Sequence, residues 1–465
     1  MIMDALEYVI RRAEKEGASQ AEAFFSRKTE LQIRAEKGEV KLGERRTDSG
    51  IGIRLAMKRK GGYSLAFTFT TDFSEDSMNK VVTRALKTCR VRKPDPDFKS
   101  FPDKKAYAKV TAIYDKRISK LPPKEAIDLV SRQMQAASAD KRAETVRGLT
   151  FLLTNEIAVA NSLGVSGDYK SSGFYSWVYV LAKEADSSGA GFDDYSNCFW
   201  DEEKPVKIAE NALELAIQQL HPRAVKGGKM DLVMAPDALS NLLIYTLIQE
   251  VRADQVQRQR SPLVGKLNQQ IASEVLTMKD DGRLPRATGS KIFDDEGAPT
   301  TKTPIIEKGV LRSFLYDTYT AKKENRESTG NAARNVLLQL VPKYRLEPFI
   351  GPTNIVIEPG TNSKDEIVED VKNGIITKDF IGAHTSNPQT GAFSMAPYMA
   401  SKIENGEITH SIKEAMIGGD ILSLLKNVKI IGNDVKQVQF YNAALIKDAT
   451  LIAPTILIGD VSVSA

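Results

Sequence analysis

The first 221 residues contain the same succession of apolar patterns twice. In each copy, apolar residues first recur with a helical period, then alternate with polar residues, and then recur with a helical period again. Apolar residues that recur every three or four positions predict amphipathic helices, and alternation predicts half-buried strands. The predicted helices are residues 3–17, 75–87, 124–139 and 204–220, and the predicted strands are residues 30–36, 40–46, 50–57, 63–69, 142–159 and 172–185. The repeat predicts two related helix–sheet–helix halves, about 1–90 and 122–221, that share one antiparallel sheet system.

A linker at residues 222–229 precedes a different pattern, a series of short β segments separated by turn sequences. The predicted strands are residues 230–234, 274–278, 303–307, 310–316, 354–358 and 400–404. This spacing predicts a β-rich barrel or sandwich-like domain over residues 222–465, with inserted helices such as residues 362–376. Together with an N-terminal α+β domain over residues 1–221, it predicts an α+β fold for the whole chain.

One apolar run just past the midpoint ends abruptly in polar residues. Residues 241–254 predict a short buried helix whose exit carries Gln249, Glu250, Arg252 and Asp254. Ionisable residues at the end of a buried helix, near the entrance of a new domain, are where we expect chemistry.

Charge and cysteine usage narrow the class of protein. The net charge of +5, from 65 basic and 60 acidic residues, is too small to predict a nucleic-acid partner. Cys89 and Cys198 have no metal-binding or disulfide spacing, which is typical of a reducing compartment. The sequence shows neither a signal peptide nor a run of apolar residues long enough to span a membrane, so we expect a cytoplasmic protein without a membrane partner.

A series of turn motifs in the C-terminal half carries a family resemblance. The motifs are Lys279-Asp-Asp-Gly282, Phe293-Asp-Asp-Glu-Gly297, Ile306-Glu-Lys-Gly-Val-Leu311, Ser328-Thr-Gly-Asn331, Ile403-Glu-Asn-Gly-Glu407, Gly418-Gly-Asp420 and Ile430-Ile-Gly-Asn-Asp434. With these motifs in this order, the chain resembles the TldD/PmbA family, which has been described both as modulators of DNA gyrase and as metalloproteases.

The resemblance implies a metal site that this chain does not keep. Active members carry a His-Glu-x-x-x-His helix and a late cysteine that bind Zn²⁺, and the glutamate is the general base for the metal-bound water. Here Gln249 and Asp254 stand at the two histidine positions, Glu250 stands at the general-base position, and residues 441–445 contain no cysteine. Because a neutral amide oxygen is a poor zinc ligand, the resemblance is closest to the PmbA branch, also called TldE. It implies no cofactor in this chain and zinc in a TldD-like partner.

The implied function is that of a non-catalytic subunit of a TldD-type metalloprotease that cleaves small or unfolded peptides, as a heterodimer with a TldD-like subunit. Two alternatives stay open. One is an autonomous peptidase with a non-standard site built on Glu250 and Asp254, to which His384 could add a ligand. The other is a peptide-binding or regulatory homodimer without catalysis.

The same residues also have structural interpretations, which the sequence favours. Glu250 and Asp254 would pair with Arg252 and Arg258, and His384 would form hydrogen bonds within a Gly/Ser/Pro-rich loop. Alternatively, Arg252, Arg258 and His384 would line a peptide-binding cleft, because guanidinium groups bind carboxylates through paired hydrogen bonds. Residues 294–297 are predicted to form a turn and residues 330–334 a supporting loop, neither with a chemical role.

Overall fold

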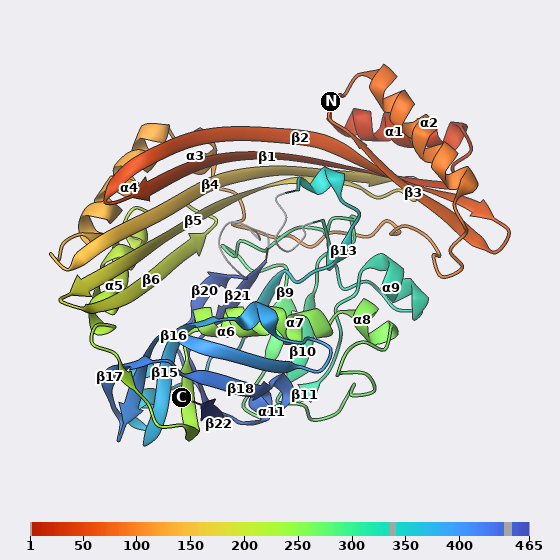
Figure 1. Cartoon of the computed structure of the whole chain (residues 1–465). Coiled ribbons are helices and arrows are strands. Elements are labelled where there is room, and N and C mark those ends of the chain that lie inside the picture. Colours follow the sequence, from red (N-terminus) through yellow and green to blue (C-terminus); the bar gives the residue numbers. More distant parts are fainter. Residues whose placement is uncertain (1, 335–340, 441–448, 465) are drawn as a thin grey trace.

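The fold is α+β, as predicted, and its N-terminal part is built on one long antiparallel sheet. The computed structural model describes residues 2–334, 341–440 and 449–464. The sheet has the strand order β3-β2-β1-β4-β5-β6 and arches over the C-terminal part of the chain (Figure 1). Its strands are β1 (Gln20–Glu36), β2 (Glu39–Arg59), β3 (Gly62–Thr70), β4 (Ala143–Asn161), β5 (Ser166–Glu184) and β6 (Ser187–Asn197). β6 was not predicted as a separate strand.

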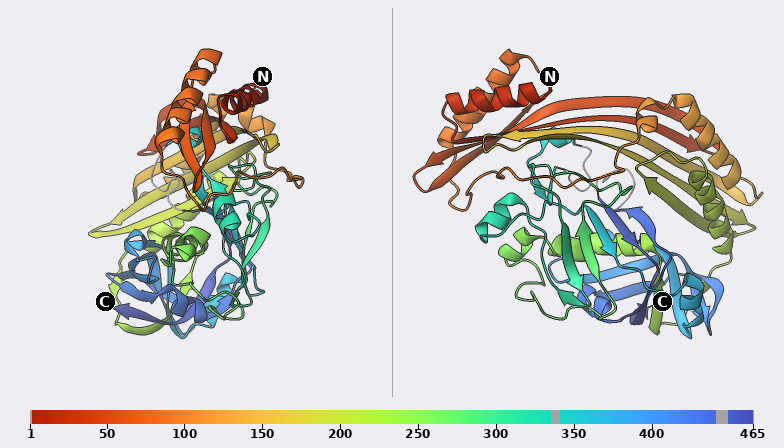
Figure 2. Two further views of the ribbon diagram at one scale, coloured as in Figure 1. Left: turned by 90° about the vertical axis from the view of Figure 1, so that its right-hand side faces the viewer. Right: turned by 180° about the vertical axis from the view of Figure 1, so that it is seen from behind.

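Two pairs of helices pack near opposite ends of this sheet (Figures 1 and 2). α1 (Ile2–Lys15) and α2 (Glu75–Val91) form one pair, and α4 (Pro123–Ala137) and α5 (Lys204–Gln218) form the other, while α3 (Lys116–Lys120) is a short helix in the connector. These four long helices confirm the periodicity-based predictions. No described helix combines the length and the apolar composition needed to cross a membrane.

Alternation along β1 decides which side chains face the C-terminal part. Ala21, Ala23 and Phe25 pack against α1 and α2. Glu22 and Phe24 therefore point to the other face, where Phe24 packs with Phe293 of the C-terminal part. The sheet thus has a helix-covered face and a face that meets the rest of the molecule.

The described residues of the C-terminal part form two further large sheets around a shared apolar core, and a two-stranded sheet of β12 and β13. One has the order β11-β10-β9-β14-β21-β20. In the other, β15, β8, β22, β18 and β16 follow one another, and pairing of β15 with β16 closes them into a ring. The barrel-like prediction is confirmed.

The elements of this part follow in chain order: β7 (Arg223–Ala224), β8 (Gly228–Met234), α6 (Pro236–Tyr245), α7 (Leu247–Glu250), α8 (Ala253–Gln257), β9 (Met278–Asp281), β10 (Lys302–Glu307), β11 (Val310–Leu311), α9 (Thr318–Lys323), β12 (Ala332–Ala333), η1 (Lys343–Arg345), β13 (Phe349–Ile350), β14 (Asn354–Ile357), α10 (Lys364–Glu369), β15 (Asn373–Ile381), η2 (Ala383–Thr385), β16 (Ala392–Glu404), β17 (Glu407–Lys413), β18 (Met416–Asp420), α11 (Ile421–Lys426), β19 (Val428–Ile431), β20 (Lys436–Gln439), β21 (Thr450–Ala453) and β22 (Ile456–Ser464).

Several predicted boundaries in this part are wrong. Residues 274–277 and 312–316 lie outside strands. The helix predicted at 362–376 ends with α10 at Glu369, and residues 373–376 belong to β15. β15 is buried beside β8 and β16, so a short apolar run that suits a helix was placed in a sheet by its neighbours.

The single helix predicted at 241–254 is also wrong. Its first part is α6, a buried helix, as expected. The helix is interrupted at Thr246, whose hydroxyl donates to the Leu242 carbonyl at 2.7 Å, and again at Arg252, where the backbone is extended. The predicted helix is thus three helices, α6, α7 and α8.

Candidate functional site

The residues singled out at 249–254 lie on both sides of the second helix break. Gln249 and Glu250 end α7, and Asp254 belongs to the first turn of α8. Leu315 holds the break open, because its N–H donates to the Val251 carbonyl at 2.8 Å and its carbonyl accepts from the Ala253 N–H at 2.9 Å. Gln249 and Asp254 therefore do not share one helix face.

The guanidinium of Arg252 connects these two side chains. Its Nη1 donates to Gln249 Oε1 at 3.0 Å, and its Nε and Nη2 donate to the two carboxylate oxygens of Asp254, each at 3.1 Å. The ring of Phe349 lies 5.6 Å from the guanidinium. The exposed fraction is 18% for the Arg252 side chain and 16% for that of Asp254, so water screens this pair only in part. The predicted ion pair between Asp254 and Arg252 is confirmed.

Glu250 is placed differently from the other residues of this segment. Only 3% of the residue is exposed, and its Oε2 has no hydrogen-bond partner among the described residues. Burial raises the pKa of Glu250 to about 7, against the positive charge of Arg252, which lowers it. A pKa in this range suits a general base, but Glu250 is absent from the lining of the adjacent cavity described below.

The side chains at the predicted metal positions do not fit zinc. Gln249 offers a neutral amide oxygen, and that oxygen and both carboxylate oxygens of Asp254 already accept hydrogen bonds from Arg252. The permanent positive charge of Arg252 would also repel a divalent cation at this point. Residues 441–445, where the resemblance places a third ligand, lie outside the described residues.

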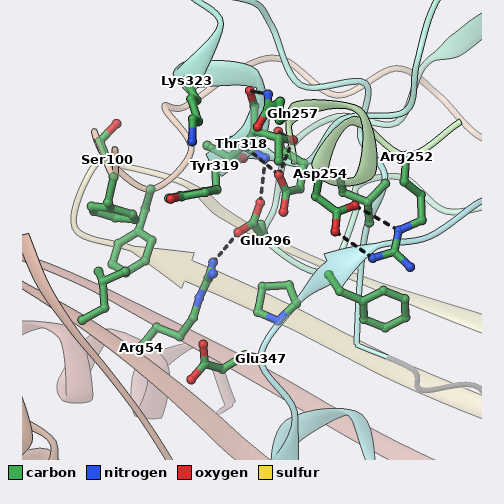
Figure 3. Close-up of a pocket in the computed structure, with 18 of the residues that line it drawn as sticks. Arg54, Ser100, Arg252, Asp254, Gln257, Glu296, Thr318, Tyr319, Lys323 and Glu347 are labelled. Atoms are coloured by element: carbon green, nitrogen blue, oxygen red, sulfur yellow. Dashed lines mark hydrogen bonds and ion pairs between the residues drawn. The ribbon is translucent and has the colours of Figure 1, made fainter. Parts of the chain in front are cut away.

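A cavity of about 290 Å³ lies beside Arg252 and Asp254, between the N-terminal sheet and the C-terminal part. We call it the α8–α9 cavity. In Figure 3, Arg54 points from the N-terminal sheet toward Glu296, while Arg252 pairs with Asp254 on the other side of the group. Its lining combines β2 and β3, the connector around Phe98 and Phe101, and α8, α9 and β13.

The charges that line the α8–α9 cavity balance. Four basic and four acidic side chains contribute: Arg54, Arg252, Arg258 and Lys323, and Asp254, Glu296, Asp317 and Glu347. Most of the Arg258 side chain is exposed, 61%, and its Nη1 lies 3.9 Å from Asp254 Oδ2. Arg258 is therefore freer than Arg252 to meet a ligand, whereas the cavity as a whole offers no excess of positive charge.

The structure does not bring His384 to the α8–α9 cavity. His384 is exposed in η2, and its ring lies 6.4 Å from that of Tyr245. It lines a second, larger cavity under β5 and β6. The three residues predicted to line one peptide-binding cleft are thus divided, with Arg252 and Arg258 in one cavity and His384 in the other.

Comparisons with known proteins agree with this architecture. A sequence model described as the PmbA/TldA metallopeptidase C-terminal domain matches residues 227–465. Models of the central domain and of domain 1 of these metallopeptidases match residues 116–220 and 21–89. The chain belongs to the PmbA/TldD metallopeptidase family.

Relatives in this family match nearly the whole chain. An uncharacterised protein of Methanocaldococcus jannaschii is 32% identical over 434 residues, covering 93% of this chain and 95% of that protein. Metalloprotease PmbA of Escherichia coli O157:H7 is 27% identical over 424 residues, covering 90% and 88%. The crystal structure of TldE from Thermococcus kodakarensis matches with a TM-score of 0.87 at 25% identity, covering 99% of this chain and 100% of that chain.

A buried group of charges that the sequence did not reveal joins the two parts of this family member. We call it the junction cluster, and its members are Glu22, Arg54, Asp295, Glu296 and Arg334. Arg54 donates to both carboxylate oxygens of Glu22, at 2.9 and 2.6 Å, and to Glu296 at 2.7 Å. Arg334 Nη2 donates to Glu22 at 2.6 Å, across 312 positions of sequence.

Arg334 is fully enclosed in the junction cluster. Its side chain has no exposed area, and its guanidinium lies 4.6 Å from the ring of Phe24. Its Nη1 donates to the Leu346 carbonyl at 2.6 Å, and its Nε donates to the Asp295 carbonyl at 3.1 Å. Every polar group of this side chain is thus paired inside the protein, as a buried charge requires.

The turn predicted at residues 294–297 is present, but its carboxyl groups are buried rather than exposed. Asp294 Oδ1 accepts from the Glu296 and Ala298 N–H groups at 3.0 and 2.9 Å. Burial and the nearby charge of Glu296 raise the pKa of Asp294. For Glu296, Arg54 outweighs the effect of burial and lowers the pKa. One feature of the sequence could have indicated the junction cluster, namely Glu22, a charged residue inside the apolar start of β1.

We expect Arg252→Met to destabilise the protein by about 1–3 kcal/mol, because Asp254 and Gln249 would lose their shared, partly buried donor. Arg258→Met is the matched control. Arg258 lies one helical turn after Asp254, approaches the same carboxylate only at 3.9 Å and is exposed, so we expect a much smaller change. Urea unfolding followed by circular dichroism measures both. Equal effects of the two substitutions would show that the Arg252 bridge adds no stability.

Proposed function

We propose that this chain is a cytoplasmic, non-catalytic subunit of a TldD-type metalloprotease and forms a heterodimer with a TldD-like chain that carries the zinc. The complex cleaves small or unfolded peptides. The observation that carries this proposal is the Arg252 guanidinium, which holds the two side chains at the positions of the zinc-binding histidines. The guanidinium places a permanent positive charge where the metal would lie. It cannot replace the metal in catalysis, because it does not bind a water and lower its pKa as zinc does.

The relatives support the choice of branch. One relative is described as metalloprotease PmbA, and a solved structure that matches the whole chain is described as TldE. The burial of Glu250 supports the non-catalytic role, because a general base must come within hydrogen-bond reach of a substrate or water.

A second candidate function is autonomous peptidase activity, and one observation favours it. The pKa of Glu250, raised to about 7, is that of a carboxyl group suited to exchange protons near neutral pH. This candidate requires a water or substrate to reach Glu250, which the present packing prevents. Exchange of Glu250 for glutamine therefore separates the two candidates.

We expect the purified chain to contain far less than one zinc ion per molecule and to cleave no peptide by itself. Mixed with a TldD-like chain that carries the His-Glu-x-x-x-His motif, it should co-elute as a stable complex that cleaves unfolded peptides. Elemental analysis, size-exclusion chromatography and a fluorescent peptide assay measure these properties. The Glu250→Gln variant should support cleavage in the complex as well as the wild type does.

Two results would contradict the proposal. Stoichiometric zinc together with chelator-sensitive cleavage by the lone chain, lost in Glu250→Gln, would establish the autonomous peptidase. A stable homodimer that binds peptide but associates with no TldD-like chain would instead establish the regulatory homodimer.

A further inference from the structure

The second cavity, which we call the aromatic cavity, has a volume of about 530 Å³, within the roughly 300–1,000 Å³ of small-molecule sites. It lies between the inner face of the N-terminal sheet and the elements α6, β15, η2, β16 and β20. Tyr175, Trp177 and Tyr179 alternate along β5 and so present three aromatic rings to it, and Phe192 and Tyr398 add two more. These rings form the walls of the cavity.

The floor of the aromatic cavity is acidic. Asp194, Asp237 and Asp379 line it. Asp193 adjoins Asp194 and Asp237, and one carboxylate oxygen from each of these three residues lies within 4.8 Å of the others. Burial raises the pKa of Asp194 to about 7 and that of Asp379 to about 6. A cation placed beside a carboxyl group whose pKa is raised by burial stabilises the ionised form of that group. Such carboxyl groups therefore favour the binding of a cation.

Two lysines already occupy the centre of the carboxylate group. Lys436 Nζ lies 2.8 Å from Asp193, 2.6 Å from Asp194 and 3.2 Å from Asp237. Lys378 Nζ lies 2.9 Å from Asp193 and 2.8 Å from Asp237. A metal ion would have to displace both ammonium groups, so the carboxylates do not make a metal site.

Among the described residues, neither lysine forms an ion pair with Asp379. Asp379 Oδ1 accepts from Asn241 Nδ2 at 2.9 Å and from the Phe380 N–H at 2.7 Å. The lining and the residues behind it contain four aspartates and two lysines, and Arg147 at the rim adds one more basic side chain. Acidic side chains therefore outnumber basic ones by one around the aromatic cavity.

Two amide side chains in the lining have spare hydrogen-bond acceptors. The side-chain oxygens of Asn241 and Gln439 are buried, and neither has a donor among the described residues. Their amide NH₂ groups are already used, by Asp379 and the Phe380 carbonyl in one case and by Thr288 in the other. A ligand rich in N–H donors would satisfy these oxygens.

The backbone of the lining carries strain at one position. Met399 has a φ of +52°, a left-handed conformation that costs a residue with a side chain about 1–2 kcal/mol. Such strain collects at ligand-binding positions, where the surrounding structure holds it in place.

We infer that the aromatic cavity binds a lysine or arginine side chain of a peptide. Aromatic faces attract ammonium and guanidinium groups, the carboxylate of Asp379 supplies the opposite charge, and the amide oxygens of Asn241 and Gln439 accept N–H donors. The inference rests on the proposed function in one respect, that the ligand is a peptide. It adds that this subunit selects peptides by a basic side chain.

The test uses the purified full chain and four blocked tripeptides, acetyl-Ala-X-Ala-amide, in which X is lysine, arginine, norleucine or glutamate. Binding is measured by isothermal titration and by the fluorescence of Trp177, a lining residue. We expect the lysine and arginine peptides to bind at least about tenfold more tightly than the norleucine peptide, the size of one charge-assisted hydrogen bond. The glutamate peptide should bind more weakly still.

Two variants locate the binding. Asp379→Asn keeps the shape of the side chain and should weaken the lysine peptide about tenfold, and Trp177→Leu should weaken it roughly threefold through loss of the aromatic face. Asp128→Asn, an exposed carboxylate on α4 that pairs with Lys124 at the surface and lines neither cavity, is the matched control and should change nothing. Circular dichroism verifies that each variant is folded.

Equal affinity for the lysine and norleucine peptides, no binding of the lysine peptide, or unchanged binding by folded Asp379→Asn would overturn the inference. These outcomes are independent of the proposed function. If the chain still forms an active complex with a TldD-like partner, only the basic specificity fails. If the lysine peptide binds but no partner associates, the subunit role fails and the specificity stands.

Discussion

Arg334→Met is expected to lower the free energy of unfolding by about 3–5 kcal/mol, the cost of removing one member of a buried ion-pair network. Glu22 would keep only Arg54, and the Leu346 carbonyl would lose its donor. Methionine resembles the aliphatic stem of arginine but lacks the guanidinium, so the loss combines the missing charge and hydrogen bonds with the space that the guanidinium filled. Calorimetry and urea unfolding measure the change.

The control for this experiment is Arg46→Met on β2 of the same sheet. Arg46 is exposed and pairs only with Glu44 across the surface, so its loss should leave the unfolding midpoint unchanged. The junction cluster joins the N-terminal sheet to the C-terminal part, so Arg334→Met should also make the two parts unfold in separate steps. An unchanged, single transition in Arg334→Met would show that the cluster does not couple the two parts.

Glu250→Gln is expected to change the pH dependence of stability by about 2.5 kcal/mol between pH 5 and pH 8. Burial raises the pKa of Glu250 to about 7 in the folded protein, from an ordinary value near 4.5. At pH 5 the unfolded chain has already released most of the Glu250 proton, whereas the folded protein releases it only near pH 7. Raising the pH through this interval therefore favours the unfolded state, and the wild type loses stability. Glutamine has no proton to release, so the variant does not lose this contribution.

The informative quantity is therefore how the stability difference between the two proteins varies with pH. At either pH alone, that difference also contains the cost of replacing the carboxyl group, which interacts with Ser261, by a buried amide. Urea unfolding at pH 5 and pH 8 separates the two effects, because the amide cost is the same at both. A difference that does not vary with pH would show that Glu250 has an ordinary pKa and that water reaches it.

Local patterns predicted much of the fold. The four long helices of the N-terminal part and most of its strands follow from apolar periodicity, because each of these elements buries one continuous face. The C-terminal errors share a different cause. At 362–376, a short apolar run suits more than one structure, and pairing of its second half with the distant strands β8 and β16 decided between them.

The candidate site was predictable in its residues but not in its geometry. The resemblance singled out Gln249, Glu250 and Asp254, and it identified the family correctly. The hydrogen bonds of Leu315 that break the helix were not predictable, because they come from a segment more than sixty positions away. Because of this break, Arg252 bridges Gln249 and Asp254, the two residues that the resemblance aligns with the zinc-binding histidines.

The sequence by itself determined the periodic elements, the family and the absence of a zinc-binding residue set at 249–254. These properties depend on neighbouring residues or on residue identity alone. Only the tertiary structure decided that Arg252 joins Gln249 to Asp254, that Arg334 meets Glu22, and that Glu250 is buried while the aromatic cavity stays open. The physical reason is that charge pairing and desolvation depend on which distant segments exclude water from a side chain, and no local pattern records those segments.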